Sequence, residues 1–126
     1  MVEGSFATVI NCMDGRTQLS VNEFLRKKYG VDYVDTITEP GPIKYLADGT
    51  DKTVIDSIKN RVAISIEKHG SGAIGIVGHF GCAGNPVSKE MQLEQLELAV
   101  KMVRSWGFDV DVVKLWVDEN WTVHEV

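Results

Sequence analysis

Two short stretches that lie far apart in the chain carry residues able to bind a metal ion. Residues 11–16 read Asn-Cys-Met-Asp-Gly-Arg, and residues 78–82 read Gly-His-Phe-Gly-Cys. Together they supply two thiolates, Cys12 and Cys82, and the imidazole of His79, a soft ligand set that suits Zn²⁺. Three protein ligands leave one open position on a tetrahedral zinc. An open position is typical of a catalytic zinc, because water can bind there and lose its proton near neutral pH.

Taken together, the two stretches resemble a known family signature. Cys-x-Asp-x-Arg at residues 12–16, followed by His-x-x-Cys at residues 79–82, is similar to the zinc motif of the β-class carbonic anhydrases. The resemblance implies one Zn²⁺ per chain, bound by Cys12, His79 and Cys82. It further implies a catalytic dyad, in which Asp14 accepts a hydrogen bond from a zinc-bound hydroxide and Arg16 holds Asp14 by an ion pair.

The reaction implied by this resemblance is the reversible hydration of CO₂ to bicarbonate by the zinc-bound hydroxide, so the protein would be a zinc lyase. Two alternatives remain open at this stage. The same site could hydrolyse carbonyl sulfide or carbon disulfide, which are linear like CO₂ and would be favoured by a more apolar pocket mouth. The chain could also be a non-catalytic zinc-binding protein, because it departs from the family after the second predicted strand. There it has Glu-Pro-Gly-Pro at residues 39–42, where the family commonly has Arg-Asn-Ala-Gly.

Each of the site residues also has a purely structural explanation. A cysteine at the end of a buried strand is commonly a small core residue, and Asp14 with Arg16 could be a surface ion pair worth under about 1 kcal/mol. The joint occurrence of all five residues, in this order, favours the metal site over these explanations.

The composition is that of a soluble globular protein. The chain has 126 residues, 44% of them hydrophobic and 25% charged, which fits one domain over residues 1–126. The formal net charge is −5 and there is no basic run, so we expect no nucleic-acid partner. No apolar run approaches the roughly 18 residues of a membrane span, and the start of the chain lacks the pattern of a signal peptide. We therefore expect no membrane partner and a cytoplasmic location.

Strand-like and helix-like segments alternate along the chain. Short apolar runs rich in β-branched residues predict four strands, and apolar residues at helical spacing predict three longer helices and one short one. The strands are expected at residues 6–11, 31–38, 73–78 and 110–117, with a candidate antiparallel fifth strand within 121–126. The helices are expected at residues 21–29, 43–47, 52–69 and from about 85–88 to 106.

This alternation predicts an α/β fold with a mostly parallel sheet and helices on both faces, since parallel strands need helical crossovers. We expect the strand order 2-1-3-4, which the family also shows. In that order the chain reverses direction across the sheet between strands 1 and 3, and ligands of open α/β sheets bind at this switch point. Cys12 and His79 each fall at the carboxyl end of one of these two strands. The fold and the motifs therefore predict the same location for the site.

Three further expectations concern side chains outside the motifs. The glutamine and glutamate residues of the last helix should face solvent, whereas Met91 and Leu96 should face inward. Trp106, Trp116 and Trp121 are interpreted as core or interface residues rather than substrate platforms. The third concerns the oligomeric state. The family resemblance and an apolar fourth strand at a sheet edge predict a homodimer.

Overall fold

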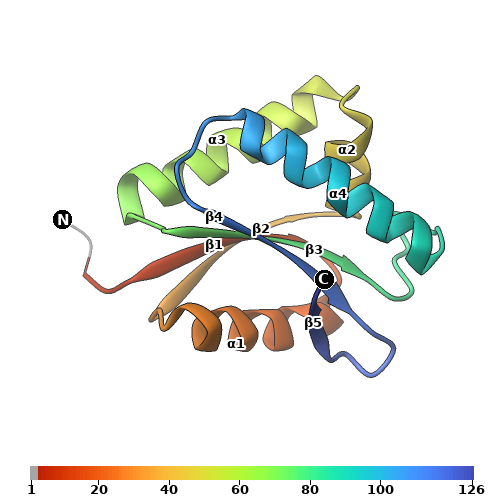
Figure 1. Ribbon diagram of the computed structural model, residues 1–126, viewed down its shortest axis with the longest axis horizontal. Coiled ribbons are helices and arrows are strands. Elements are labelled where there is room, and N and C mark those ends of the chain that lie inside the picture. The colour runs from red at the N-terminus through yellow and green to blue at the C-terminus, as the bar shows by residue number, and fades with distance from the viewer. Residues whose placement is uncertain (1–2) are drawn as a thin grey trace.

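Buried β-branched residues form the centre of a five-stranded sheet in the computed structural model, which describes residues 3–126 (Figure 1). The strand order is β2-β1-β3-β4-β5. The strands are β1 (Phe6–Cys12), β2 (Tyr33–Glu39), β3 (Ala73–His79), β4 (Asp111–Val117) and β5 (Val123–Glu125). The first four are parallel, and β5 pairs antiparallel with β4. The predicted α/β class, strand order and antiparallel fifth strand are confirmed.

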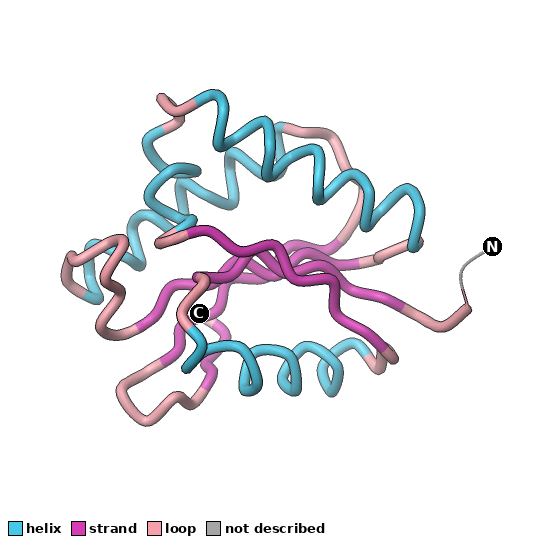
Figure 2. The backbone as a smooth tube through the Cα atoms, turned by 180° about the vertical axis from the view of Figure 1, so that it is seen from behind, coloured by secondary structure: helices cyan, strands magenta, loops and turns pink. Residues whose placement is uncertain are grey.

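Helices cover both faces of the sheet, as predicted, but unequally. Figures 1 and 2 show α1 alone on one face and α2, α3 and α4 together on the other. The helices are α1 (Gln18–Tyr29), α2 (Pro42–Asp48), α3 (Lys52–His69) and α4 (Lys89–Ser105), and a 3₁₀ turn, η1 (Gly15–Thr17), precedes α1. None of the helices within residues 3–126 is both long and apolar enough to cross a membrane.

Local signals place both ends of α3 where the sequence predicted them. The carboxylate of Asp51 accepts a hydrogen bond from the backbone N–H of Val54 at 3.1 Å and so caps the start of α3. Gly70 ends the same helix in the left-handed conformation, with φ of 70°, which glycine adopts without steric cost. Because both signals lie within a few residues of the helix ends, they depend little on the rest of the fold.

The apolar core has two parts, one on each face of the sheet. The larger part lies between the sheet and α2, α3 and α4 and includes Ile10, Ile58, Ile76 and Leu96. The smaller part lies on the α1 side and contains Val9, Val21, Leu25, Val77, Val113, Leu115 and Val117. Residues of β1 and β3 contribute to both parts, because successive side chains of a strand point to opposite faces. The two strands that end at Cys12 and His79 are therefore fixed from both sides.

The predicted inner face of the last helix is wrong at two positions. Met91 is 45% exposed, whereas Gln92 is only 2% exposed. The side chain of Gln92 lies against Gly78, where a Cβ atom would come within 3.0 Å of its Oε1 atom. The missing side chain at Gly78 thus leaves room for a polar group in the core, and the backbone of His79 provides its hydrogen-bond partners at 2.8 and 3.1 Å.

The prediction that the fourth strand forms a sheet edge is also wrong. β5 pairs with residues Leu115, Trp116 and Val117 of β4, so the edges of the sheet are β2 and β5. The chain reverses direction at residues 118–122, so that β5 runs antiparallel beside β4. A dimer therefore cannot be argued from an exposed β4 edge.

Two loops at the carboxyl edge of the sheet pack backbone against backbone. Gly84 lies against Pro40, and a Cβ atom added to Gly84 would be 2.7 Å from the carbonyl carbon of Pro40. Gly41, with φ of 60°, lies equally close to Asn85. The unusual Glu-Pro-Gly-Pro stretch at residues 39–42 is thus matched to the Ala-Gly-Asn stretch at residues 83–85.

We predict that Gly84→Ala lowers the free energy of unfolding by about 1–3 kcal/mol, because the methyl group forces the two loops apart. Urea denaturation followed by circular dichroism measures the change. Gly72→Ala is the matched control, since a Cβ atom there meets no heavy atom within 4 Å. An equal effect of the two substitutions would show that the loops do not pack as described.

Candidate metal centre

The pairing of β1 with β3 brings the two sequence motifs together. In this parallel pair Ile10 lies opposite Ile76, so Cys12 and His79, a few residues further on, end at the same edge of the sheet. Cys82 follows in the loop after β3. The switch point predicted from the strand order therefore holds all three predicted ligands.

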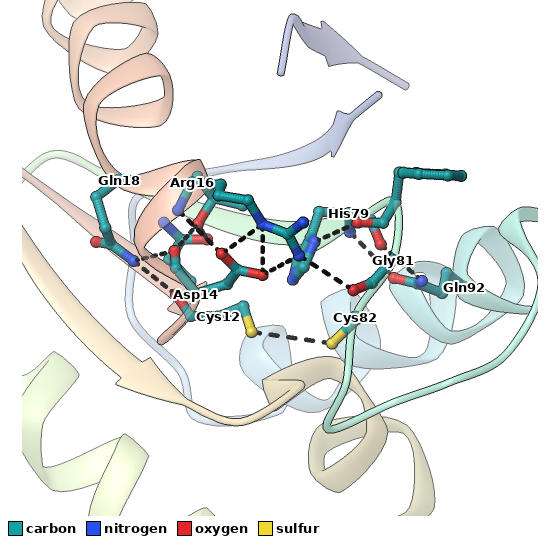
Figure 3. Close-up of polar contacts among 11 residues, drawn as sticks. Cys12, Asp14, Arg16, Gln18, His79, Gly81, Cys82 and Gln92 are labelled. Carbon is teal, nitrogen blue, oxygen red and sulfur yellow. Dashed lines mark hydrogen bonds and ion pairs between the residues drawn. The ribbon is translucent and has the colours of Figure 1, made fainter. Parts of the chain in front are cut away.

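The predicted ligands form one buried cluster. The Sγ atoms of Cys12 and Cys82 and a ring nitrogen of His79 all lie within 4.8 Å of one another, and all three residues are buried. The two Sγ atoms are 3.8 Å apart, too far for a disulfide (Figure 3). Two sulfurs that bind one tetrahedral zinc at about 2.3 Å lie about 3.8 Å apart. The sulfur spacing therefore fits a shared zinc ion.

The imidazole of His79 is oriented for metal binding. Its Nδ1 atom lies 2.8 Å from the carbonyl oxygen of Phe80, so Nδ1 carries the proton and donates it to that oxygen. This leaves a lone pair on Nε2, which is buried and has no hydrogen-bond partner among the residues described. A buried nitrogen of this kind is costly unless something binds it, and a metal ion is the ligand that the neighbouring sulfurs favour.

A glutamine holds the backbone of the histidine. Gln92 donates from Nε2 to the carbonyl oxygen of His79 at 2.8 Å and accepts at Oε1 from its N–H at 3.1 Å (Figure 3). Both bonds are buried, so they fix where β3 ends and where the imidazole begins. The sequence analysis missed Gln92 because its position on the helix was assigned to solvent.

Negative charge on the sulfur atoms is stabilised by nearby hydrogen-bond donors. A hydrogen bond from the thiol of Cys82, helped by the backbone N–H groups of Gly41 and Asp14, lowers the pKa of Cys12 to about 4, against the effect of burial. The same sulfur–sulfur contact raises the pKa of Cys82, as does its burial. In the metal-free chain the two sulfurs thus share one proton, which a bound cation would displace.

The predicted dyad is formed beside the cluster. Arg16 donates from Nε to Asp14 Oδ1 at 3.1 Å and from Nη2 to Oδ2 at 2.7 Å, and its backbone N–H donates to Oδ1 at 2.9 Å. Hydrogen bonding from the Arg16 side chain holds the pKa of Asp14 at about 2. Asp14 therefore stays ionised throughout the neutral pH range. Arg16 also reaches the carbonyl oxygen of Gly81 at 3.4 Å, which links the first motif to the second.

The backbone between Cys12 and the dyad is held by side chains of the following turn. Gln18 donates from Nε2 to the carbonyl oxygens of Cys12, at 2.7 Å, and Asp14, at 3.2 Å. The hydroxyl of Thr17 donates to the carbonyl oxygen of Asp14 at 2.8 Å. These contacts fix the turn that places Asp14 beside Cys12 at the pocket. Their signal in the sequence is weak, because polar residues at the start of a helix are common.

A pocket of about 220 Å³ opens beside Cys12 and Asp14. Its other lining residues are Met13, Pro40, Ala83 and Gly84. One wall thus comes from the 39–42 stretch and the other from the loop after Cys82, the two loops that pack against each other. The pocket brings one predicted ligand and the predicted acceptor to a small, mostly apolar space.

One aromatic residue of the site was assigned elsewhere by the sequence analysis. The ring of Trp121 lies under the guanidinium of Arg16, with its centroid 4.4 Å from Cζ, and its centroid is 6.4 Å from that of the His79 ring. The expectation of a core position is met in part, since Trp121 packs at the border of the α1-side core. No local sequence pattern predicts the contact between Trp121 and Arg16, because the contact depends on the turn between β4 and β5.

Two solved structures with a similar fold are carbonic anhydrases. The chain is similar to the β-carbonic anhydrase isoform I of Trichomonas vaginalis, with a TM-score of 0.62 and 16% identity over 99% of this chain and 85% of that one. It is also similar to a carbonic anhydrase of Streptococcus mutans, with a TM-score of 0.56 and 17% identity over 96% and 80% of the two chains. At this level of identity the likeness establishes the fold.

The sequence itself matches a family model. No curated protein matches the chain. The model of a family described as "Putative carbonic anhydrase" matches residues 2–126, almost the entire chain. The match covers both motifs and the sheet that brings them together. The chain therefore belongs to this carbonic anhydrase family.

Proposed function

We propose that the protein catalyses the zinc-dependent, reversible hydration of CO₂ to bicarbonate. The observation that carries the proposal is the buried Cys12–His79–Cys82 cluster with an ionised Asp14 held beside it at the mouth of a small pocket. Family membership and the fold support the same reaction class.

The three clustered side chains would hold one zinc ion per chain. Their sulfur spacing, the free Nε2 atom of His79 and the backbone donors around the sulfurs all suit that metal. When bound, zinc would supply a Lewis acid that lowers the pKa of a coordinated water toward neutrality and so provides a nucleophile at ordinary pH.

Asp14 would act as a hydrogen-bond acceptor for the attacking group. A carboxylate has about four acceptor sites, and three N–H groups of Arg16, a residue that does not line the pocket, donate to Asp14. The remaining acceptor capacity is available toward the pocket that Asp14 lines. Such an acceptor would hold the proton of the nucleophile and direct its lone pair at the substrate carbon.

Arg16 would keep this acceptor in place and ionised. Its guanidinium pairs with both oxygens of Asp14, which prevents the carboxylate from turning toward the metal ligands. Without Arg16, Asp14 could itself take the open metal position and close the site.

The pocket walls suit a small linear substrate. Met13, Pro40, Ala83 and Gly84 present apolar side chains or backbone, which favour an uncharged molecule such as CO₂ over water. The same apolar mouth favours carbonyl sulfide or carbon disulfide as a second candidate substrate. Stopped-flow measurement with zinc-loaded protein, using CO₂ and carbonyl sulfide in parallel, ranks the two. Absence of both reactions between about pH 6 and 9 would favour a non-catalytic zinc protein.

We predict about one equivalent of zinc per chain, because residues 3–126 contain a single such ligand cluster. Elemental analysis of the purified protein measures it. Cys12→Ser and Cys82→Ser should each lower the zinc content sharply, since a hydroxyl is a poor ligand beside a thiolate. Full metal retention in both variants would rule out the site.

We predict that Asp14→Asn slows CO₂ hydration by roughly 10²-fold or more, because a neutral amide can present its NH₂ group instead of an acceptor. Arg16→Ala should also slow the reaction, by freeing Asp14 to block the open position. Zinc content should remain near one equivalent in both variants, which separates these effects from loss of metal.

The two variants should differ in anion binding. Small anions that compete for the open position should still inhibit or bind Asp14→Asn but should bind Arg16→Ala poorly, because only the second variant retains a carboxylate able to occupy that position. Hydration at the parent rate in both variants would contradict the proposed roles.

We also propose that the protein is a homodimer. The family resemblance supports this, and so does β2, a seven-residue edge strand that has no partner on its outer side within the described chain. Tyr33 of this strand and Ile64 of the adjacent helix are each 55% exposed. Multi-angle light scattering should give about twice the monomer mass of 13.9 kDa. A monomer mass at micromolar concentration would overturn this proposal.

A further inference from the structure

The ring of Trp121 contacts the guanidinium of Arg16, which is paired with Asp14. Arg16 Cζ lies 4.4 Å from the ring centroid, within the range of a cation–π contact. Asp14 accepts hydrogen bonds from N–H groups in the plane of the Arg16 guanidinium, whereas the Trp121 ring packs against the face of that plane. Both contacts can therefore form at the same time. Trp121 therefore restricts movement of the guanidinium toward one of its faces, which the in-plane hydrogen bonds to Asp14 do not restrict.

Arg16 needs such support because most of it is exposed. Its side chain is 56% exposed, whereas that of Asp14 is 18% exposed. An ion pair of an exposed arginine is weak by itself, since water competes for the guanidinium and the side chain loses entropy on pairing. The contact with Gly81 is long, at 3.4 Å. The ring of Trp121 is thus a substantial part of what keeps Arg16 over Asp14.

The loop that carries Trp121 is built to hold the ring there. Trp121 has φ of 61°, and within residues 3–126 it is the one non-glycine residue with positive φ. A bulky residue in this conformation is strained and persists only where the surroundings enforce it. The surroundings are the β4–β5 turn, in which the Trp121 N–H donates to the carbonyl oxygen of Asp118 at 2.9 Å.

Asp118 closes this turn with its side chain. Its Oδ1 atom accepts from the backbone N–H groups of Asn120, at 2.9 Å, and Thr122, at 3.0 Å, on either side of Trp121. Its Oδ2 atom lies 2.7 Å from Nε2 of His124 on β5. Both carboxylate oxygens of Asp118 thus stabilise the turn that carries the strained residue Trp121. This support indicates that the position of the Trp121 ring is specified rather than incidental.

We propose that Trp121 is a positioning residue that holds Arg16 on Asp14, so that the β4–β5 turn controls whether the Asp14 carboxylate stays away from the metal ligands. This role for Asp14 and Arg16 rests on the proposed function, but the contact itself does not. Two substitutions distinguish the effect of the aromatic ring from the effect of an apolar side chain of any kind. Trp121→Leu removes the aromatic face and keeps an apolar side chain, whereas Trp121→Phe keeps an aromatic face.

The first test measures the ion pair without any turnover. Nuclear magnetic resonance of the Arg16 Nε–H group, which donates to Asp14, reports solvent exchange of that proton and the shift caused by the ring. In Trp121→Leu the exchange should be about twofold to fivefold faster, the change that loss of one exposed cation–π contact produces. Trp121→Phe should restore most of the protection.

The second test measures access to the metal position. Co²⁺ takes the same nitrogen and sulfur ligands as Zn²⁺, and its visible absorption reports its coordination. In Co²⁺-loaded Trp121→Leu, a less restrained Asp14 competes for the open position. The affinity for thiocyanate should therefore fall by up to about twofold to fivefold relative to the parent. Trp121→Phe should bind thiocyanate nearly as the parent does.

Trp116→Phe is the matched control for loss of a large indole. Trp116 lies on β4, and its neighbours Leu115 and Val117 belong to the α1-side core, so its own side chain lies on the other face of the sheet. It should change neither the Arg16 signal nor the thiocyanate affinity. If Trp121→Leu does not fold by circular dichroism, Trp121→Gly replaces it, because glycine adopts φ of 61° without strain.

Unchanged Arg16 exchange and thiocyanate affinity in Trp121→Leu would overturn the proposal. An equal loss in Trp121→Phe would overturn it as well, since a conserved aromatic face should preserve the contact. Failure of the parent protein to hydrate CO₂ would count against the proposed function alone, because the Arg16 measurement needs no substrate.

Discussion

The parallel pairing of β1 with β3 is the constraint on which the candidate site depends. These two strands lie at the centre of the sheet, and their carboxyl ends deliver Cys12 and His79 to one edge. Between them the chain forms η1, α1, β2, α2 and α3 before it returns. A different neighbour for β1 would separate the two motifs by at least one additional strand spacing of about 4.8 Å. The buried core on both faces of β1 and β3 is therefore also what holds the ligand cluster together.

Polar contacts with the backbone, rather than with the ligand atoms, give the site its geometry. Gln92 binds the backbone of His79, and Gln18 binds the carbonyl oxygen of Cys12. The backbones of Gly41 and Gly84 lie close to each other because neither residue carries a side chain. Their N–H groups stabilise negative charge on the sulfurs of Cys12 and Cys82, respectively. In this way the Glu-Pro-Gly-Pro stretch, which departs from the family pattern, still forms a wall beside Cys12.

The electrostatic arrangement of the site is graded from the interior to the surface. The sulfurs and the imidazole are buried, Asp14 is partly accessible, and Arg16 is mostly exposed. A charged group loses the least solvation free energy when it stays in contact with water. The guanidinium of Arg16 accordingly lies at the surface, where it binds the partly buried carboxylate of Asp14. The exposed partner is also the one most easily lost to solvent. The ring of Trp121 lies where it reduces that loss.

The sequence by itself determined the features that depend on residue type and short spacing. The candidate ligands, the Asp14–Arg16 pair, the strand and helix segments and caps such as Asp51 follow from residues within one element or one turn. The switch-point location followed as well, because alternating strands and helices leave few sheet topologies. Only the tertiary structure decided the contacts between elements. Gln92 was assigned to solvent because helical periodicity alone does not reveal that Gly78 leaves room for an amide opposite it. Trp121 was assigned to the core or an interface because its approach to Arg16 depends on the turn after β4, which brings distant parts of the chain together.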